Sequence, residues 1–96
     1  MFFAYIVQSL ASGRFYIGHS DDVDQRVEDH NTGRSHYTKG RGPWELVYAE
    51  AFRTRAEAMS REREIKKRKS KRYIEKLIKK SGRAGKELLK YRGTVG

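Results

Sequence analysis

Arg26 and His30 are the first residues in the chain whose types and spacing indicate chemistry. They lie four residues apart, so they share one face of a predicted helix with Val23 and Val27, the face expected to pack on a sheet. An arginine held there can stabilise the negative charge that grows on a phosphate during hydrolysis. For His30 the alternative interpretation is structural: a basic group that stabilises the C-terminal end of the helix.

Glu62 also falls on an apolar face. It follows Ala58 by four residues, follows Met59 by three and precedes Ile65 by three, which places it on the inward stripe of a longer predicted helix. A buried carboxylate is costly unless it is paired or coordinates a cation. Glu62 is therefore either a metal ligand or a structural partner for Arg26 at the edge of the core.

Together with Tyr5 and Tyr16, these groups match the needs of a phosphodiester hydrolysis site. The carboxylate would hold a hard divalent cation, which polarises a phosphoryl oxygen, and a tyrosine hydroxyl would move a proton to or from water. Mg²⁺ prefers octahedral oxygen ligation and often takes the remaining ligands from water and substrate phosphate. We therefore expect a single carboxylate to bind metal weakly in the absence of substrate.

Short segments rich in aromatic and β-branched residues predict the sheet that positions these groups. Residues 2–19 have the pattern of a β-hairpin, with strands at Phe2 to Ser9 and Phe15 to Gly18 joined by a turn that contains Gly13. Trp44 to Phe52 has the pattern of a third strand, apolar enough in its middle to be buried on both faces.

Three predicted helices complete the domain. The first starts at residues 21–22, where an aspartate can cap it, and ends at Gly33. The second starts at a capping box at residues 54–57 and runs to about Lys69, and Ser70 can cap a third. The predicted fold is α+β, a three-stranded antiparallel sheet flanked by helices in the order β-β-α-β-α-α.

The charge of the chain is unevenly distributed. The 96 residues carry a formal net charge of +10. Residues 1–52 hold five basic and seven acidic groups, whereas residues 53–96 hold 17 basic and five acidic groups. Such an excess attracts a polyanion, and nucleic acid is the commonest candidate, although a merely solvated helix surface explains a charge run equally well. The basic stretch lacks the broad apolar face of a helix that lies on a membrane.

The residue types that are missing narrow the class of protein further. The chain has no cysteine, which excludes disulfides, thiolate metal sites and a cysteine nucleophile, and which fits a reducing compartment such as the cytoplasm. No apolar run approaches the ~20 residues of a membrane span. The N-terminal segment does not have the pattern of a signal peptide.

Five ordered segments carry a resemblance to a known family. They are Phe3-Ala4-Tyr5, Tyr16-Ile17-Gly18, the helix segment 24–31 with its Arg and His four apart, residues 37–48, and the segment 58–66 that contains Glu62. In this order and spacing the chain resembles the GIY-YIG nuclease superfamily, most of all its small stand-alone bacterial members, which are similar to the N-terminal nuclease domain of excinuclease ABC. The resemblance covers residues 2 to about 80, and Phe3-Ala4 stands where the family has Gly-Ile.

The resemblance implies roles for single residues. Tyr5 would be the general base or would orient the attacking water, and Tyr16 would hydrogen-bond at the scissile phosphate. Arg26 would clamp the phosphate, and His30 would hold or deprotonate a tyrosine. Glu62 would bind Mg²⁺ or Mn²⁺. The resemblance further implies that residues 1–82 form the nuclease domain, followed at 83–96 by an extension that is partly helical or loose.

Further residues are predicted to contact nucleic acid. Gly18 would let the backbone approach the substrate, because it has no side chain. The others are basic or aromatic side chains of the Gly-rich loop and of the basic run: Tyr37, Lys39, Arg41, Lys66, Lys67, Arg68, Lys69, Lys71 and Arg72. They would contact phosphates without reading the base sequence. His19 and His36 could flank the site.

Three functions remain open at this point. The first is a metal-dependent endonuclease that acts on DNA, for example on branched or damaged DNA, and DNA is expected before RNA. The second is a non-catalytic nucleic-acid-binding module on the same fold, which the altered first motif and the basic half favour. The third is a protein partner within a larger repair assembly. No membrane partner is expected, and the oligomeric state stays open.

Overall fold

The computed structural model describes residues 1–33, 40–68 and 70–80. Its elements follow in the order β1 (Phe2–Ser9), β2 (Phe15–Ser20), α1 (Val23–Thr32), β3 (Trp44–Phe52) and α2 (Arg55–Arg68). Residues 71–80 are again helical. The three strands form one antiparallel sheet in the order β2-β1-β3. The predicted fold class and element order are therefore confirmed.

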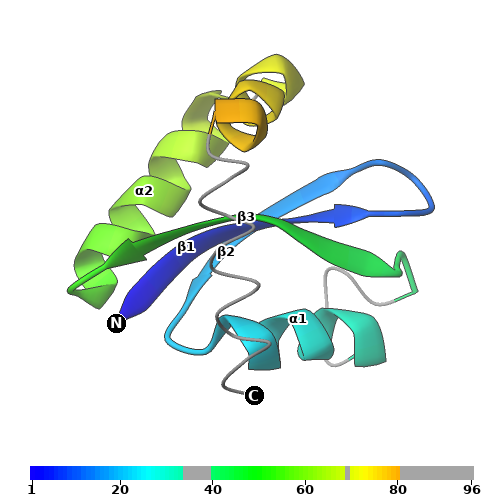
Figure 1. The fold of residues 1–96 in the computed structure, drawn as a ribbon, viewed down its shortest axis with the longest axis horizontal. Helices are drawn as coiled ribbons and strands as arrows, with labels where there is room; N and C mark the ends of the chain where they lie inside the picture. Colours follow the sequence, from blue (N-terminus) through cyan, green and yellow to red (C-terminus); the bar gives the residue numbers. More distant parts are fainter. Residues whose placement is uncertain (34–39, 69, 81–96) are drawn as a thin grey trace.

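Helices cover both faces of the sheet (Figure 1): α1 lies on one face, and α2 with residues 71–80 lies on the other. On the α1 face, Tyr5 and Val7 of β1 pack with Val23 and Trp44 in a buried cluster. On the α2 face, Ile6 packs with buried residues of β3, α2 and the last helix, namely Tyr48, Ile65 and Ile74. The alternation of β1 side chains thus divides one small core into two layers.

An irregularity in β3 explains its long apolar run. Ile6 pairs with Tyr48 whereas its neighbour Val7 pairs with Leu46, so the register shifts by one residue at Val47. Val47 and Tyr48 consequently both pack on the α2 face, while Leu46 packs on the α1 face. The middle of this strand is apolar on both sides for that reason, as the sequence predicted.

Side-chain caps begin the helices at the predicted places. The Asp22 side chain accepts a hydrogen bond from the Gln25 backbone N–H, and Gly33 ends α1 with a left-handed φ of 81°. Thr54 and Glu57 form the predicted capping box. These local signals fix where α1 and α2 start, and therefore which of their residues face the sheet.

One expectation about α2 was wrong. Met59 is not part of the inward stripe: its exposed fraction is 36%, whereas Ala58 and Ile65 are almost fully buried. Ala58 and Ile65 are seven residues apart, so they lie two turns apart on the same line of the helix, and Met59 is rotated away from it. The buried stripe of α2 is therefore narrower than its apolar residues suggested.

Candidate active site

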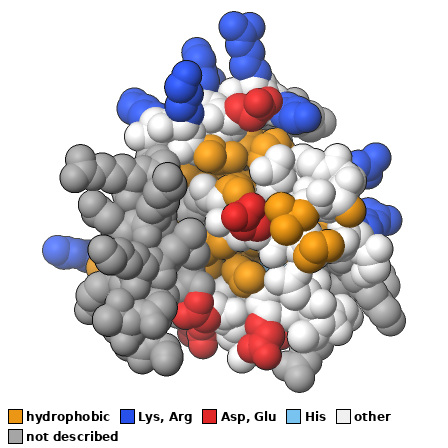
Figure 2. Space-filling model, turned by 45° about the vertical axis from the view of Figure 1, so that its right-hand side comes forward, with side chains coloured by type: hydrophobic (Ala, Val, Ile, Leu, Met, Phe, Trp, Pro, Cys, Tyr) orange, Lys and Arg blue, Asp and Glu red, His pale blue; other side chains and the backbone are white. Residues whose placement is uncertain are grey.

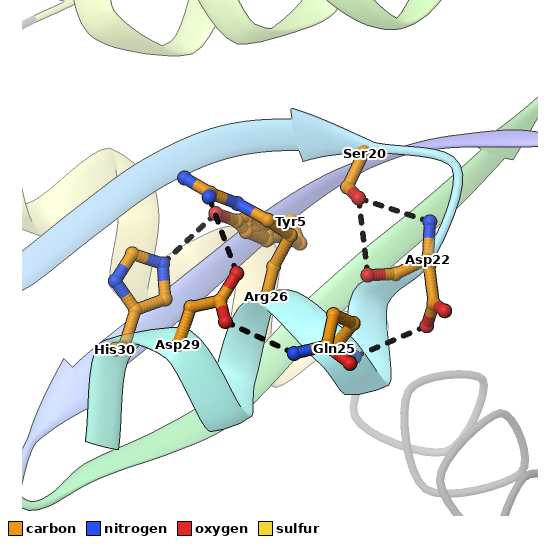
Figure 3. A network of polar contacts seen from close by, with 7 residues as sticks. All are labelled: Tyr5, Ser20, Asp22, Gln25, Arg26, Asp29 and His30. Atoms are coloured by element: carbon orange, nitrogen blue, oxygen red, sulfur yellow. Dashed lines mark hydrogen bonds and ion pairs between the residues drawn. The ribbon is translucent and has the colours of Figure 1, made fainter. Parts of the chain in front are cut away.

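Tyr5 and His30 form the buried centre of the polar site. The Tyr5 hydroxyl lies 2.9 Å from Nε2 of His30, and the two residues have exposed fractions of 0% and 2%. They come from the sheet and from α1, 25 residues apart in the chain. Figure 3 shows the His30 ring and the Arg26 guanidinium converging on that hydroxyl from α1.

Burial sets the protonation states of this pair. It raises the pKa of Tyr5 to about 12, although the neighbouring guanidinium of Arg26 opposes that rise. It lowers the pKa of His30 to about 4, and the positive charge of Arg26 lowers it further. At neutral pH the phenol is therefore protonated and the imidazole is uncharged. His30 is consequently not the helix-terminal cation that the structural interpretation proposed.

Gly18 provides the space that the Tyr5 side chain fills. The two residues are direct partners across the β1–β2 ladder. A Cβ atom at position 18 would stand 2.6 Å from the Tyr5 hydroxyl oxygen and 2.8 Å from two ring carbons. The Tyr5 ring therefore lies across the backbone of Gly18 toward the outer edge of the sheet. The sequence assigned Gly18 to substrate approach, whereas its nearest neighbour is this ring.

Tyr16 and Arg26 lie at the more exposed rim of the same site. The Tyr16 ring meets the His30 ring edge to face, with centroids 4.8 Å apart. Arg26 keeps 38% of its side chain exposed and reaches Asp29 at 3.5 Å. Burial lowers the pKa of Arg26, but interactions with Tyr5, Tyr16 and Asp29 outweigh that effect and raise it. This guanidinium remains charged and partly open to an anion.

Glu62 approaches from the other layer of the protein. Its Oε1 atom lies 2.6 Å from Nδ1 of His19, and its Oε2 atom accepts a hydrogen bond from Nζ of Lys66 at 2.7 Å. Burial raises the pKa of Glu62, but these two partners outweigh it, so that the pKa lies below its usual range. The carboxylate is ionised at neutral pH, and its Oε1 therefore accepts the proton of His19 Nδ1.

The partners of Glu62 correct one interpretation. Glu62 does not pair with Arg26, which contacts Asp29 instead, because α1 and α2 cover opposite faces of the sheet. The carboxylate is also half-buried rather than part of the core, with 15% of its side chain exposed. Its charge still reaches Tyr5, where it contributes to the raised pKa. The edge strand β2, which carries His19 between the two layers, is where the halves of the site meet.

Residues that could hold a metal are few in the described part of the chain. No cluster of three or more His, Asp or Glu residues occurs among the residues that the structure describes. Glu62 offers two hard oxygen atoms, and the ammonium on one of them belongs to Lys66, whose side chain is half exposed. One displaceable lysine and an ionised carboxylate fit a single divalent cation that takes its other ligands from water and phosphate.

The other predicted contacts have different fates. Tyr37, Lys39 and Lys69 lie outside the described residues, as do His36 and the segment 83–96. Arg41, Lys66 and Lys67 are exposed, as contact with a substrate requires. Figure 2 shows Lys and Arg side chains projecting from the end of the molecule formed by residues 71–80 and the end of α2. None of the described helices is long and apolar enough to pass through a bilayer.

Sequence reasoning missed two polar links. His19 was noted only as a residue that could flank the site, yet it is bonded to Glu62. Arg61 donates from Nε to Glu50 of β3 at 3.1 Å and from a terminal nitrogen to the Tyr73 hydroxyl at 3.2 Å. These pairs join elements far apart in sequence, and no local pattern announces them.

Comparison with known proteins agrees with the geometry. A family model described as the GIY-YIG catalytic domain matches residues 1–77. UPF0213 proteins of Staphylococcus aureus, for example from strains Mu50 and N315, are 49% identical over 65 residues, which is 67% of this chain and 78% of theirs. The solution NMR structure of a UPF0213 protein from Bacillus halodurans is similar with a TM-score of 0.53 at 39% identity, covering 85% of this chain and 87% of that one.

Proposed function

The chain belongs to the GIY-YIG nuclease superfamily, and from this premise we propose that it is an endonuclease that hydrolyses DNA phosphodiester bonds with the help of a divalent cation. Family membership supports a nuclease-type activity in general. The observation that carries the more specific proposal is the hydrogen-bonded pair of Tyr5 and His30 beside the Arg26 guanidinium. It combines a proton route and an anion-binding group in one place.

The proton route runs from water through Tyr5 to His30. Because His30 is uncharged at neutral pH and its Nε2 faces a protonated phenol, we assign that nitrogen as the acceptor of the Tyr5 proton. As Tyr5 loses its proton to His30, its oxygen can take a proton from the attacking water. The Tyr5 hydroxyl is shielded in the absence of substrate, so this role requires that a phosphate engaging Arg26 uncovers it.

The rim residues would hold the phosphate. Arg26 would stabilise the charge that grows on the phosphoryl oxygens, and Tyr16, which is only half-buried, would donate a hydrogen bond to one of them. Glu62 would supply an oxygen ligand to Mg²⁺ or Mn²⁺ once Lys66 is displaced. A cation held there supplies Lewis-acid polarisation of a phosphoryl oxygen. His19 keeps the carboxylate oriented by its hydrogen bond to Oε1.

The substrate would approach over the basic layer. Lys66 and Lys67 of α2 are exposed on the same helix as Glu62, and Arg41 is exposed in the loop before β3. Contacts of this kind bind the backbone of any sequence and weaken with salt. We propose DNA, branched or damaged, before RNA, and a role in repair, with residues 1–82 as the catalytic domain and 83–96 as an extension.

A non-catalytic nucleic-acid-binding module is the second candidate. Two observations favour it: Phe3-Ala4 replaces the first two residues of the first motif, and the Tyr5 hydroxyl is fully buried. A binding module would use the same basic layer and would need neither the cation nor the proton route. The two functions therefore differ in what happens when Glu62 loses its charge.

The test is a cleavage assay with the full chain at low salt in Mg²⁺ or Mn²⁺. Substrates are duplex, single-stranded, flapped and four-way DNA and an RNA, and binding is scored in the same samples. Glu62→Gln should abolish metal-dependent cutting, a loss on the order of 10³-fold or more, while binding persists. Glu64→Gln is the matched control, because it removes the same charge from an exposed position of the same helix.

Several outcomes would contradict the nuclease. Binding without cutting by the unaltered chain on every substrate and with both metals would favour the binding module. Cutting that survives Glu62→Gln, or that ignores a chelator, would remove Glu62 and the cation from the mechanism. An RNA that is cut in preference to every DNA would correct the substrate class.

A further inference from the structure

A hollow of about 320 Å³ lies at the tip of the β1–β2 hairpin, away from the side chains assigned above to catalysis. Two segments distant in sequence form it: the hairpin turn and the loop that precedes β3. Its described lining residues are Ala11, Ser12, Arg14, Gly40, Arg41 and Gly42. Two of the six are arginines and none is acidic, so the hollow has a positive lining.

A buried hydroxyl holds the two segments together. Ser9 has an exposed fraction of 1%, and its Oγ donates to the Arg41 carbonyl oxygen at 2.7 Å. The same oxygen accepts the backbone N–H of Ser12 at 3.0 Å. A second link, from the Leu10 N–H to the Pro43 carbonyl at 2.8 Å, runs beside it. The distance between the two arginine-bearing segments is therefore fixed by the fold rather than by their side chains.

The charges of the two arginines are uncompensated. No carboxylate in the described ranges pairs with Arg14 or Arg41, and both residues are exposed. Arg26 and Arg61, in contrast, contact Asp29 and Glu50. A guanidinium presents a planar fork of donors that matches the oxygens of a phosphate. Two free forks on a preset hollow suit a phosphodiester backbone.

The hollow also adjoins the candidate active site. Gly40 and Gly42 line a second hollow of about 390 Å³, which reaches His30 and Asn31 at the end of α1. Arg14 directly precedes β2, the strand that leads to Gly18 and on to His19 beside Glu62. A nucleic-acid strand bound at the reactive centre would pass this end of the sheet.

We propose that Arg14 and Arg41 form a second phosphate-binding subsite, which holds the substrate backbone beside the cleavage centre. The proposal rests on the nuclease function in one respect: the strand that occupies the subsite is the substrate. The subsite binds phosphates of any sequence, so it contributes affinity and register without selecting bases. Ser9 acts as its positioning residue, because its hydroxyl touches both segments but faces no ligand.

The experiment measures oligonucleotide binding in the Glu62→Gln background, which prevents cutting. The double variant Arg14→Gln/Arg41→Gln is compared with Arg53→Gln/Arg55→Gln, which removes two arginines from the opposite end of the sheet. Fluorescence anisotropy with labelled single-stranded and duplex DNA is recorded over a range of salt. We expect the hollow variant to bind about tenfold more weakly, with a log–log salt slope shallower by about 1.4 to 1.8 for two lost contacts. The control should change affinity less than about threefold.

A second measurement does not depend on substitution. Titration of the Glu62→Gln protein with a short oligonucleotide should shift the backbone amide signals of Ser12, Arg14 and Arg41 in NMR spectra. Equal effects of the two double variants, or shifts confined to other parts of the chain, would overturn the subsite. A chain that binds no oligonucleotide would overturn it as well.

The two proposals can fail separately. If the unaltered chain cuts DNA and the hollow variant binds like the control, the subsite is wrong and the nuclease stands. If no substrate is cut but the hollow variant alone loses binding, the subsite stands and the nuclease is wrong. Ser9→Ala adds a third arm: it should weaken binding in the same direction while both arginines remain.

Discussion

The two helical layers of this domain carry opposite charge. The α1 helix holds three acidic residues and one arginine, whereas α2 holds six basic residues and three glutamates. In Figure 2 most Lys and Arg side chains lie at the α2 end of the molecule, and Asp and Glu side chains lie at the α1 end. A polyanion is therefore attracted to one layer and repelled by the other.

Each layer contributes to the site the residue that opposes its own charge. Arg26 is the one Lys or Arg of α1, and it stands among the carboxylates of that helix. Glu62 lies between Arg61 and Arg63 on the basic helix. The surrounding charge keeps both groups ionised: Asp29 helps to raise the pKa of Arg26, and Lys66 helps to lower that of Glu62. The lesson is that net charge directs the substrate, while isolated opposite charges do the chemistry.

The largest expected effect separates an arginine of the acidic layer from one of the basic layer. Arg26→Met should lower turnover by roughly 10² to 10³, because no other guanidinium lies beside Tyr5 among the described residues. Arg63→Met, the control, removes an exposed cation of α2 and should change turnover only a few-fold. Cleavage rates at saturating DNA measure both. Equal losses would mean that the layers do not differ in this way.

The next effect is a pH dependence that belongs to the acidic layer. His30 has a pKa of about 4 when folded against 6.5 for the free side chain, so the unfolded chain binds more protons between these values. The free energy of unfolding contributed by His30 is therefore complete above pH 6.5 and is lost as the pH falls toward 4, by about 3 kcal/mol. Urea denaturation from pH 7 to pH 4 measures it.

His30→Gln is the control for that slope. It removes the titrating ring, so the steep part of the pH dependence should disappear, while any loss from carboxylates such as Glu62 stays. An NMR titration of the His30 ring gives the folded pKa directly. A value near 6.5 would show that the ring is not desolvated as the structure has it.

A smaller effect concerns the contact that carries Tyr5 to the edge of the sheet. Gly18→Ala forces a methyl group into the Tyr5 ring and should destabilise the fold by about 1 to 3 kcal/mol. It should also lower turnover, because the hydroxyl moves. Gly13→Asn is the control: position 13 has a φ of 77° and open space around it, which Asn tolerates. Similar denaturation midpoints for both variants would show that the Tyr5 ring yields easily.

The smallest effect belongs to the basic layer. Lys66 and Glu62 are four residues apart on α2, and Lys66 is half exposed, so Lys66→Gln should change the free energy of unfolding by less than about 0.5 kcal/mol. Removal of the competing ammonium should tighten Mn²⁺ binding by a few-fold, measured by calorimetry without DNA. Weaker Mn²⁺ binding in this variant would mean that Lys66 supports the cation rather than competes with it.

Local signals were enough to predict most of the fold. The third strand from Trp44 to Phe52 and the left-handed end of α1 at Gly33 follow from residues next to one another in the chain. The capping box of Thr54 and Glu57 spans only one helical turn. Met59 is the instructive failure, because hydrophobicity alone does not say how wide a buried stripe the neighbouring sheet can cover.

The candidate site was predictable only where one element or a resemblance supplied it. Arg26 and His30 follow from helical spacing, whereas Tyr5, Tyr16 and Glu62 gained roles from the family motifs. The contact between His19 and Glu62 joins residues 43 positions apart. It depends on which way β2 presents His19 and on where α2 crosses the sheet, and neither is written in a short stretch of sequence. The partner of Glu62 was for that reason assigned to the wrong layer.

The strand order β2-β1-β3 has a consequence for the order of folding. The central strand comes first in the chain, and its pairing with β2 joins residues as close as Tyr5 and Gly18, whereas its pairing with β3 joins Tyr5 to Ala49. Closing the shorter loop loses less chain entropy, and hairpins form in about 1 to 10 μs. A growing polypeptide can thus set the Tyr5 ring across Gly18 before β3 or either face-covering helix of the Glu62 layer has been synthesised.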